Sequence, residues 1–455
     1  MGKCITFGEY NKLYKYIWIC IFLKLIFEYI FGTDFPEEIK VLKKSSFPKN
    51  VLIQEGLNYF CMIILSKILN IYEIIQNKSE KSETLINNSD INSSRTSITT
   101  NLIYNDYEKN NLSNKSVAIV IILLIVSEQL RNTFFIINLK GLDFRMFELF
   151  FVCIITILMF RISIYKHKKF SIGFIIIFCC SLKCLSIIYR LTDDHKKRIY
   201  KIYTWLIPVG IGSFILISLL RCYTFCKIKG FLDLKFISVS KLLLFYGSFG
   251  SLICFVISAL PTFIPCLDKD SFQYTNLICN VTDIDSNNST IYYYENFFVY
   301  YKNLWINERE TYINIIYVLL ILFKMILSFL INLFSILIIK NLSPEYLICS
   351  DSVYFFITES IDSISCFFLG KFYYYKLFDL LDELFSIIGT IFYLELIEFV
   401  FCGLDFNLKK NIRRRSIQES KVGSSLDAEN EENEENEENE ENEENEENED
   451  SNLSD

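Results

Sequence analysis

Long apolar runs separated by polar stretches are the dominant pattern along this chain. A helix needs about 20 mostly apolar residues to cross the roughly 30 Å hydrocarbon core of a bilayer. Ten runs reach that length, near residues 10–32, 51–75, 116–139, 144–164, 170–190, 202–225, 238–264, 311–339, 347–369 and 378–401. The pattern predicts an all-α, polytopic membrane domain over residues 1–401, with about ten transmembrane helices.

The spacing of the runs indicates an internal duplication. Only a few residues join the third, fourth and fifth runs, and the same is true of the eighth, ninth and tenth. Short connections make consecutive helices antiparallel neighbours. Two such triplets, each preceded by two further runs, are the layout of a five-helix unit repeated with inverted topology, a 5+5 plan used by many transporters.

Three polar segments interrupt or follow the membrane domain. Residues 76–115 are rich in Asn, Ser and Thr without apolar periodicity, which predicts a disordered cytosolic loop. Residues 267–310 form a second long loop, expected on the lumenal or external side. Residues 402–455 are basic and then acidic, and their Glu-Glu-Asn repeat has a period of three, which fits neither helix nor strand and predicts a disordered tail.

Composition supports the membrane interpretation. Of 455 residues, 52% are apolar and 16% aromatic, and the mean hydropathy is +0.30 despite a net charge of -8. The stretch from Asp427 to Asp455 holds 17 acidic and no basic residues, so the rest of the chain is basic overall. Such a composition excludes an ordinary soluble enzyme and a fully disordered protein.

Basic residues give an orientation, because cytoplasmic loops carry an excess of Lys and Arg. The strongest clusters follow the fourth and the tenth runs, and they are Lys166, Lys168 and Lys169, then Lys409, Lys410 and Arg413 to Arg415. If both clusters are cytosolic, so are the two termini. The protein is then expected in an endomembrane or the plasma membrane of a eukaryotic cell.

Several short motifs are candidates for covalent modification. Met1-Gly2-Lys3-Cys4-Ile5-Thr6 fits the N-myristoylation pattern at Gly2, with Cys4 as a palmitoylation candidate. In the 267–310 loop, glycosylation patterns begin at Asn280, Asn287 and Asn288, and Cys266 has a possible disulfide partner in Cys279. The alternative is chance, because an Asn-rich chain produces such patterns elsewhere too.

Ionisable residues within spans are the candidate functional groups, because they are costly there and face a bundle interior or a cavity. In the ninth run, a helical spacing places five residues on one face: Asp351, Thr358, Glu359, Asp362 and Cys366. These carboxylates are expected to line a cavity, bind cations or protons, or pair with Lys241 and Lys324. The alternative is that some reach water at the membrane interface.

The third run carries Ser127, Glu128, Arg131 and Asn132, and Glu128 is spaced to pair with Arg131 as a clamp or as part of a polar pathway. The glycines at Gly247 and Gly250 and the stretch from Pro208 to Gly212 mark places where helices bend or approach closely. The full set of cavity candidates is Glu128, Arg131, Asn132, Lys241, Lys324, Asp351, Ser352, Glu359 and Asp362.

The sequence gives no support to enzyme chemistry. His167 and His195 are the only histidines, which leaves no basis for a histidine metal site or a Ser-His triad. The 15 cysteines have no paired zinc spacing, and no Gly-rich phosphate loop is present. We therefore expect no catalytic residue, metal or cofactor, and no nucleic-acid partner.

Short stretches resemble the drug/metabolite transporter superfamily, and in particular subfamily F-like members of the solute carrier 35 family. The likeness to helices 4, 5 and 7 lies in Phe144-Arg145-Met146-Phe147, Lys166-His167-Lys168-Lys169, Phe170-Ser171-Ile172-Gly173-Phe174 and Tyr246-Gly247-Ser248-Phe249-Gly250. The likeness to helices 8 to 10 of the solute carrier 35 family lies in Lys340-Asn341-Leu342-Ser343, Asp351-Ser352 and the run from Phe385 to Tyr393. The resemblance implies alternating access around a central cavity, with Asp351 and Ser352 near the solute.

Two functions are then expected from the sequence. The first is a carrier that moves a small polar or organic solute across the lipid bilayer, with proton or cation coupling through buried carboxylates. The second is a non-transporting scaffold or receptor-like protein whose acidic tail recruits a basic partner.

Overall fold

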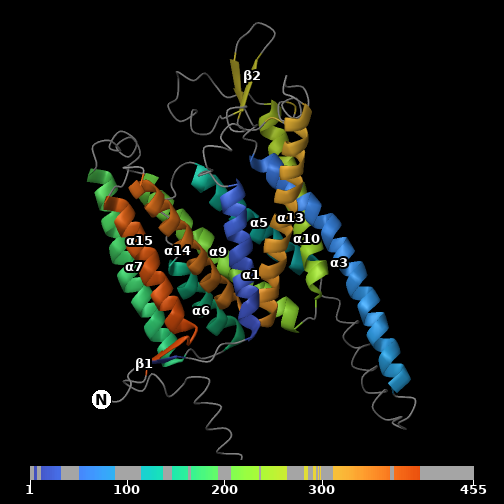
Figure 1. The fold of residues 1–455 in the computed structure, drawn as a ribbon, viewed down its shortest axis with the longest axis horizontal. Coiled ribbons are helices and arrows are strands. Elements are labelled where there is room, and N and C mark those ends of the chain that lie inside the picture. The colour runs from blue at the N-terminus through green and yellow to red at the C-terminus, as the bar shows by residue number, and fades with distance from the viewer. Residues whose placement is uncertain are drawn as a thin grey trace, which may run out of the picture. The chain divides into compact units, whose positions relative to one another are not determined.

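The structure is a computed structural model that describes residues 5–7, 12–31, 51–87, 114–136, 146–161, 165–192, 206–234, 237–263, 281–284, 290–293, 296, 298, 311–368 and 374–399. This part of the chain is helical, with short strands. Its α-helices (Figure 1) are α1 (Lys15–Phe31), α3 (Val51–Asn87), α5 (Asn114–Ile136), α6 (Met146–Phe160), α7 (Lys166–Thr192), α9 (Leu206–Leu234), α10 (Val239–Phe263), α13 (Thr311–Asn341), α14 (Pro344–Phe368) and α15 (Tyr374–Tyr393). Each of the ten predicted runs overlaps one of these helices.

Five of the helices are long and apolar enough to cross a membrane: α3, α7, α9, α10 and α13. Large apolar side chains also lie on the outside of the described helices, where Ile177 is 66% and Leu158 is 74% exposed. Exposed apolar surface on this scale is typical of a lipid-facing exterior. The described part of the chain is therefore that of a helical membrane protein.

The chain divides into two compact units. A helical unit comprises Asn11–Ile164 and Ile172–Thr390, and a terminal unit comprises Met1–Tyr10, Tyr165–Ser171 and Ile391–Asp455. Within the helical unit, α3 packs along α10, and α5 packs against α9 and α10. Helix α1 lies against α13 and α14, while α6 lies against α9 and α14. Helix α13 also contacts α3 and α9.

Two glycines allow the close contact between α3 and α10. A Cβ atom added to Gly247 would lie 2.8 Å from the carbonyl oxygen of Tyr59 and 3.0 Å from the backbone nitrogen of Ile63. A Cβ atom added to Gly250 would lie 2.5 Å from the Tyr59 ring. The close approach predicted from these glycines is confirmed. Pro208 instead lies in the first turn of α9, where proline is tolerated and marks the start of a helix.

A buried polar seam joins α7 and α15, which lie side by side (Figure 1). The Nζ atom of Lys183 lies 3.8 Å from carboxylate oxygens of both Asp379 and Asp382. Ser186 donates a 2.8 Å hydrogen bond to Asp379. These three ionisable side chains are each about 10% exposed, so the two helices bury charge between them.

The terminal unit holds the 3-residue strand β1 (Ile5–Phe7), which pairs antiparallel with β4 (Ile397–Phe399). In the same unit, His167 Nε2 lies 3.1 Å from Glu395 Oε1, and Lys168 donates a 3.4 Å hydrogen bond to the Tyr393 hydroxyl. A second strand pair, β2 (Val281–Ile284) with β3 (Thr290–Tyr293), lies within the predicted 267–310 loop.

Two predicted boundaries are wrong. Helix α3 continues to Asn87, into the segment expected to be disordered, because residues 76–87 contain good helix formers and no Gly or Pro, and extending a formed helix costs little. The last helix ends at Tyr393, and Ile397–Phe399 form a strand, which suits their β-branched and aromatic residues. Part of the 267–310 loop is a hairpin.

Several predictions fall on residues outside the described part of the chain. These residues are Gly2, Cys4, Cys266, Cys279, Asn280, Asn287, Asn288, residues 88–113 of the 76–115 loop and the 402–455 tail.

Candidate functional site

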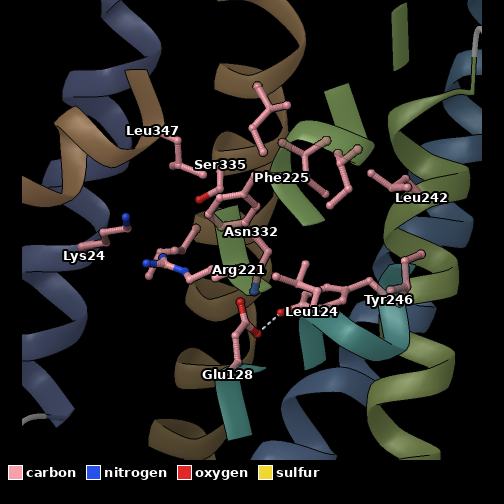
Figure 2. A pocket seen from close by; sticks show the side chains of 15 residues that line it. Lys24, Leu124, Glu128, Arg221, Phe225, Leu242, Tyr246, Asn332, Ser335 and Leu347 are labelled. Atoms are coloured by element: carbon pink, nitrogen blue, oxygen red, sulfur yellow. Dashed lines mark hydrogen bonds between the residues drawn. The ribbon is translucent and has the colours of Figure 1, made fainter. Parts of the chain in front are cut away.

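A cavity of about 160 Å³ lies between helices α1, α5, α9, α10, α13 and α14. Most of its wall is apolar, with Phe225 and Leu242 among the lining side chains (Figure 2). The polar lining residues come from five of these helices, and they are Lys24, Glu128, Arg221, Tyr246, Asn332 and Ser335. Convergent polar groups on a mostly apolar wall are typical of a small-molecule site.

Beside the cavity, five ionisable side chains form a chain of ion pairs, which we call the charge network. Arg131 of α5 lies 2.9 Å from Glu148 of α6, and Arg221 of α9 lies 2.8 Å from the other oxygen of Glu148. Arg221 also lies 3.0 Å from Asp351 of α14, which in turn pairs with Lys24 of α1. Positive and negative groups alternate along the network, so each buried charge has an opposite partner.

The sequence of α9 explains how Arg221 is held. Helical spacing places Ser218, Cys222 and Phe225 around Arg221, at positions that share its face or adjoin it. The Ser218 hydroxyl and the Cys222 thiol donate to the side chain and backbone of Glu148, at 3.4 and 3.3 Å. The Arg221 guanidinium lies 5.0 Å from the centre of the Phe225 ring. One helix face therefore fixes both the cation and its carboxylate.

Glu128 of α5 is bound differently. Its Oε2 accepts hydrogen bonds from the Tyr246 hydroxyl of α10 and, at 3.4 Å, from the Tyr59 hydroxyl of α3. Figure 2 shows the Glu128 side chain at the cavity wall, bonded to Tyr246. The two tyrosine rings meet edge to face, with centres 5.3 Å apart. Gly247 and Gly250 allow this arrangement, because they let α10 approach α3 at Tyr59.

The predicted pairing of Glu128 with Arg131 is wrong. Arg131 binds Glu148, while Glu128 lies against the tyrosines of α3 and α10. A partner from a neighbouring helix therefore replaces the one available within α5. The side chain of Asn132 lies outside the described part of the chain.

The predicted lysine partners of the α14 carboxylates are also wrong. Lys241 is exposed at the first turn of α10, where the Ser238 hydroxyl caps its backbone nitrogen at 3.2 Å. Lys324 donates a 3.2 Å hydrogen bond to Gln54 of α3. Asp351 instead pairs with Lys24 of α1 and Arg221 of α9, two helices that pack against α14.

The polar face of α14 serves two different neighbours. Asp351 belongs to the charge network, whereas Glu359 and Asp362 both pair with Lys376 of α15, Glu359 at 3.3 Å. Ser352 donates a 3.3 Å hydrogen bond to the Ile348 carbonyl of its own helix and is not among the cavity-lining residues. The predicted stripe therefore divides between the charge network and the α15 contact, and none of its residues is among those that line the cavity.

Sequence reasoning missed Glu148, Arg221, Tyr59 and Tyr246. Arg221 carried the clearest signal, since it interrupts an apolar run with small polar neighbours on its own face. Glu148 stands close to a helix start, where an acid is ordinarily favourable, and so gave no distinct signal. The tyrosines could not be separated from the many other aromatic residues.

No protein-family model and no curated protein matches this chain, so its function is argued from the site. Among the described residues, no group of three or more His, Cys, Asp or Glu side chains is placed to hold a metal ion.

Proposed function

We propose that this protein is a multi-pass carrier that moves a small polar or organic solute by alternating access, as the resemblance to drug/metabolite transporters implies. The observation that carries the proposal is the cavity with its convergent polar groups beside the charge network, inside a helical body with an apolar exterior. Burying charged side chains within a membrane costs free energy, and a non-transporting scaffold would not need a cavity lined by charged groups.

The helix contacts support a duplicated five-helix unit. In chain order, α1, α3, α5, α6 and α7 correspond to α9, α10, α13, α14 and α15. Helix α1 lies against α13 and α14, and its counterpart α9 lies against α5 and α6. The correspondence exchanges α3 with α10 and α7 with α15, so each of these two pairs is its own counterpart. A repeat with inverted topology is expected to give this exchange of neighbours.

Two ion pairs follow the same correspondence. Lys24 of α1 binds Asp351 of α14, and Arg221 of α9 binds Glu148 of α6. Each pair joins one five-helix unit to the other. Rocking of the two five-helix units about the cavity would break or rearrange these two ion pairs. The ion pairs are therefore suited to stabilise the conformation of the present structure.

The size of the cavity limits the solute. Ligand pockets usually measure about 300–1,000 Å³, whereas this cavity measures about 160 Å³. The state described therefore suits a small solute, with Asn332 and Ser335 as neutral hydrogen-bonding groups and Lys24 and Arg221 as cationic ones.

The test is counterflow of radiolabelled solutes into proteoliposomes that contain the purified full chain. A panel of amino acids, sugar phosphates, nucleotides and organic cations covers the main chemical classes. Asn332→Leu should abolish exchange by removing a cavity amide at similar volume, while the exposed Asn341→Leu on the same helix should retain it. If no solute on the panel exchanges and a basic partner is captured through residues 427–455, the protein is a scaffold.

A further inference from the structure

Three buried carboxylates lie in or next to the cavity wall, and one of them differs from the others. Glu148 binds Arg131 and Arg221, and Asp351 binds Lys24 and Arg221, so each of these has two cationic partners. Glu128 lines the cavity, and within the described part of the chain its bonding partners are tyrosine hydroxyls.

The difference decides which carboxylate can gain and lose a proton without leaving an unpaired group. Lys and Arg side chains only donate hydrogen bonds, so a protonated Glu148 or Asp351 would leave buried cations uncompensated. A tyrosine hydroxyl both donates and accepts. Ionised Glu128 accepts from Tyr246 and Tyr59, and protonated Glu128 would donate its own O–H to one of these oxygens.

Few charged groups face Glu128 from the neighbouring helices, and each of them has its own hydrogen-bond or ion-pair partner. On α3, the Glu55 carboxylate accepts a 3.4 Å hydrogen bond from Asn58. On α9, Arg221 is shared by Glu148 and Asp351. On α5 itself, Arg131 is bound to Glu148, and on α13, Lys324 donates to Gln54. Besides Tyr246, α10 contributes the buried thiol of Cys254 near Tyr59.

We propose that Glu128 is the proton-binding site of this carrier. A proton passes from water in the cavity to a Glu128 carboxylate oxygen, and it returns to water when the cavity opens to the other side. Among the described lining residues Glu128 is the one acid, so one proton accompanies each cycle. The inference rests on the proposed function for its role in transport, but the protonation itself is measurable without a solute.

The first experiment is an infrared pH titration of the purified full chain, read at the carbonyl stretch of protonated carboxyl groups. Because the chain carries 53 acidic residues, the expected result is one titrating component of the band that is lost in Glu128→Gln and persists in the matched control Glu55→Gln. Tyr246→Phe should move the midpoint of the band to higher pH by about one unit or more, because the ionised form loses a donor. A band whose titration is the same in Glu128→Gln as in the unmodified protein overturns the proposal.

The second experiment compares counterflow with and without a pH gradient, using a panel solute that exchanges. Flux should depend on the gradient in the unmodified protein, and the ratio of the two rates should fall to one in Glu128→Gln. A gradient effect that survives in Glu128→Gln overturns proton coupling and leaves the carrier function intact. If the infrared band belongs to Glu128 but no panel solute exchanges, the proposed carrier function fails while the proton site stands.

Discussion

The glycine contact between α3 and α10 makes a quantitative prediction about stability. In Gly247→Ala, the new methyl group would lie 2.8 Å from the Tyr59 carbonyl oxygen and 3.0 Å from the Ile63 nitrogen. Both are backbone atoms that no side-chain rotation can move away, so the two helices must separate. Overpacking of this kind costs about 1–3 kcal/mol.

A matched variant isolates that cost. Alanine is a better helix former than glycine by about 1 kcal/mol at any interior helix position. Gly212 lies in α9 with no atom within 4 Å of its added Cβ, so Gly212→Ala should gain helix stability without a clash. The difference in unfolding free energy between Gly247→Ala and Gly212→Ala is therefore expected to be about 1–3 kcal/mol.

The assay is thermal unfolding of the detergent-purified protein, followed with a thiol-reactive dye. Buried cysteines such as Cys222 and Cys254 have no exposed surface and react only when the helices separate. Gly247→Ala should unfold at a lower temperature than Gly212→Ala. Equal midpoints would show that α3 and α10 do not approach as closely as described, and would also remove the basis for the position of Tyr59 beside Glu128.

Three further predictions concern charge. Arg221→Met should lower stability by about 3–5 kcal/mol in the same thermal assay, since it leaves buried carboxylates without their shared cation; addition of Glu148→Gln should recover part of the loss, and fully additive losses would contradict the charge network. Lys183→Met should lower stability in the same assay, because it leaves Asp379 and Asp382 of α15 without their shared buried cation; an unchanged unfolding temperature would contradict the buried seam. Deletion of residues 427–455 should leave the counterflow rate unchanged, and a loss of flux would give the tail a role in transport.

Helix positions could be predicted from the sequence because run length and hydropathy are local properties. The partners of the buried charges could not, because a carboxylate in a span requires a cation without specifying the helix that supplies it. Lys241 and Lys324 were the expected partners of Asp351, but its cations are Lys24 of α1 and Arg221 of α9. Lys324 lies on α13, which also packs against α14, yet it donates to Gln54 of α3 instead. Contacts between helices, rather than spacing along one helix, decide such pairs.

Glu128 is a second case in which spacing along one helix did not identify the partner of a buried charge. Its spacing from Arg131 fits an ion pair within one helix, yet the side chain lies toward α3 and α10. The decisive signal was the pair of glycines at Gly247 and Gly250, which indicated a close helix contact without identifying the helix on the other side. Only the fold shows that Tyr59 fills this contact and reaches Glu128.

The short strand pair of the terminal unit constrains how many times the chain crosses the bilayer. Ile5–Phe7 and Ile397–Phe399 are hydrogen-bonded to each other, so both segments must lie on the same side of the membrane. The number of crossings between them must then be even. Five helices satisfy the length and hydropathy criterion, and five is odd. If all five cross, at least one further segment must cross as well, and the described helices outside this set include α1, α5 and α14, which carry Lys24, Glu128 and Asp351.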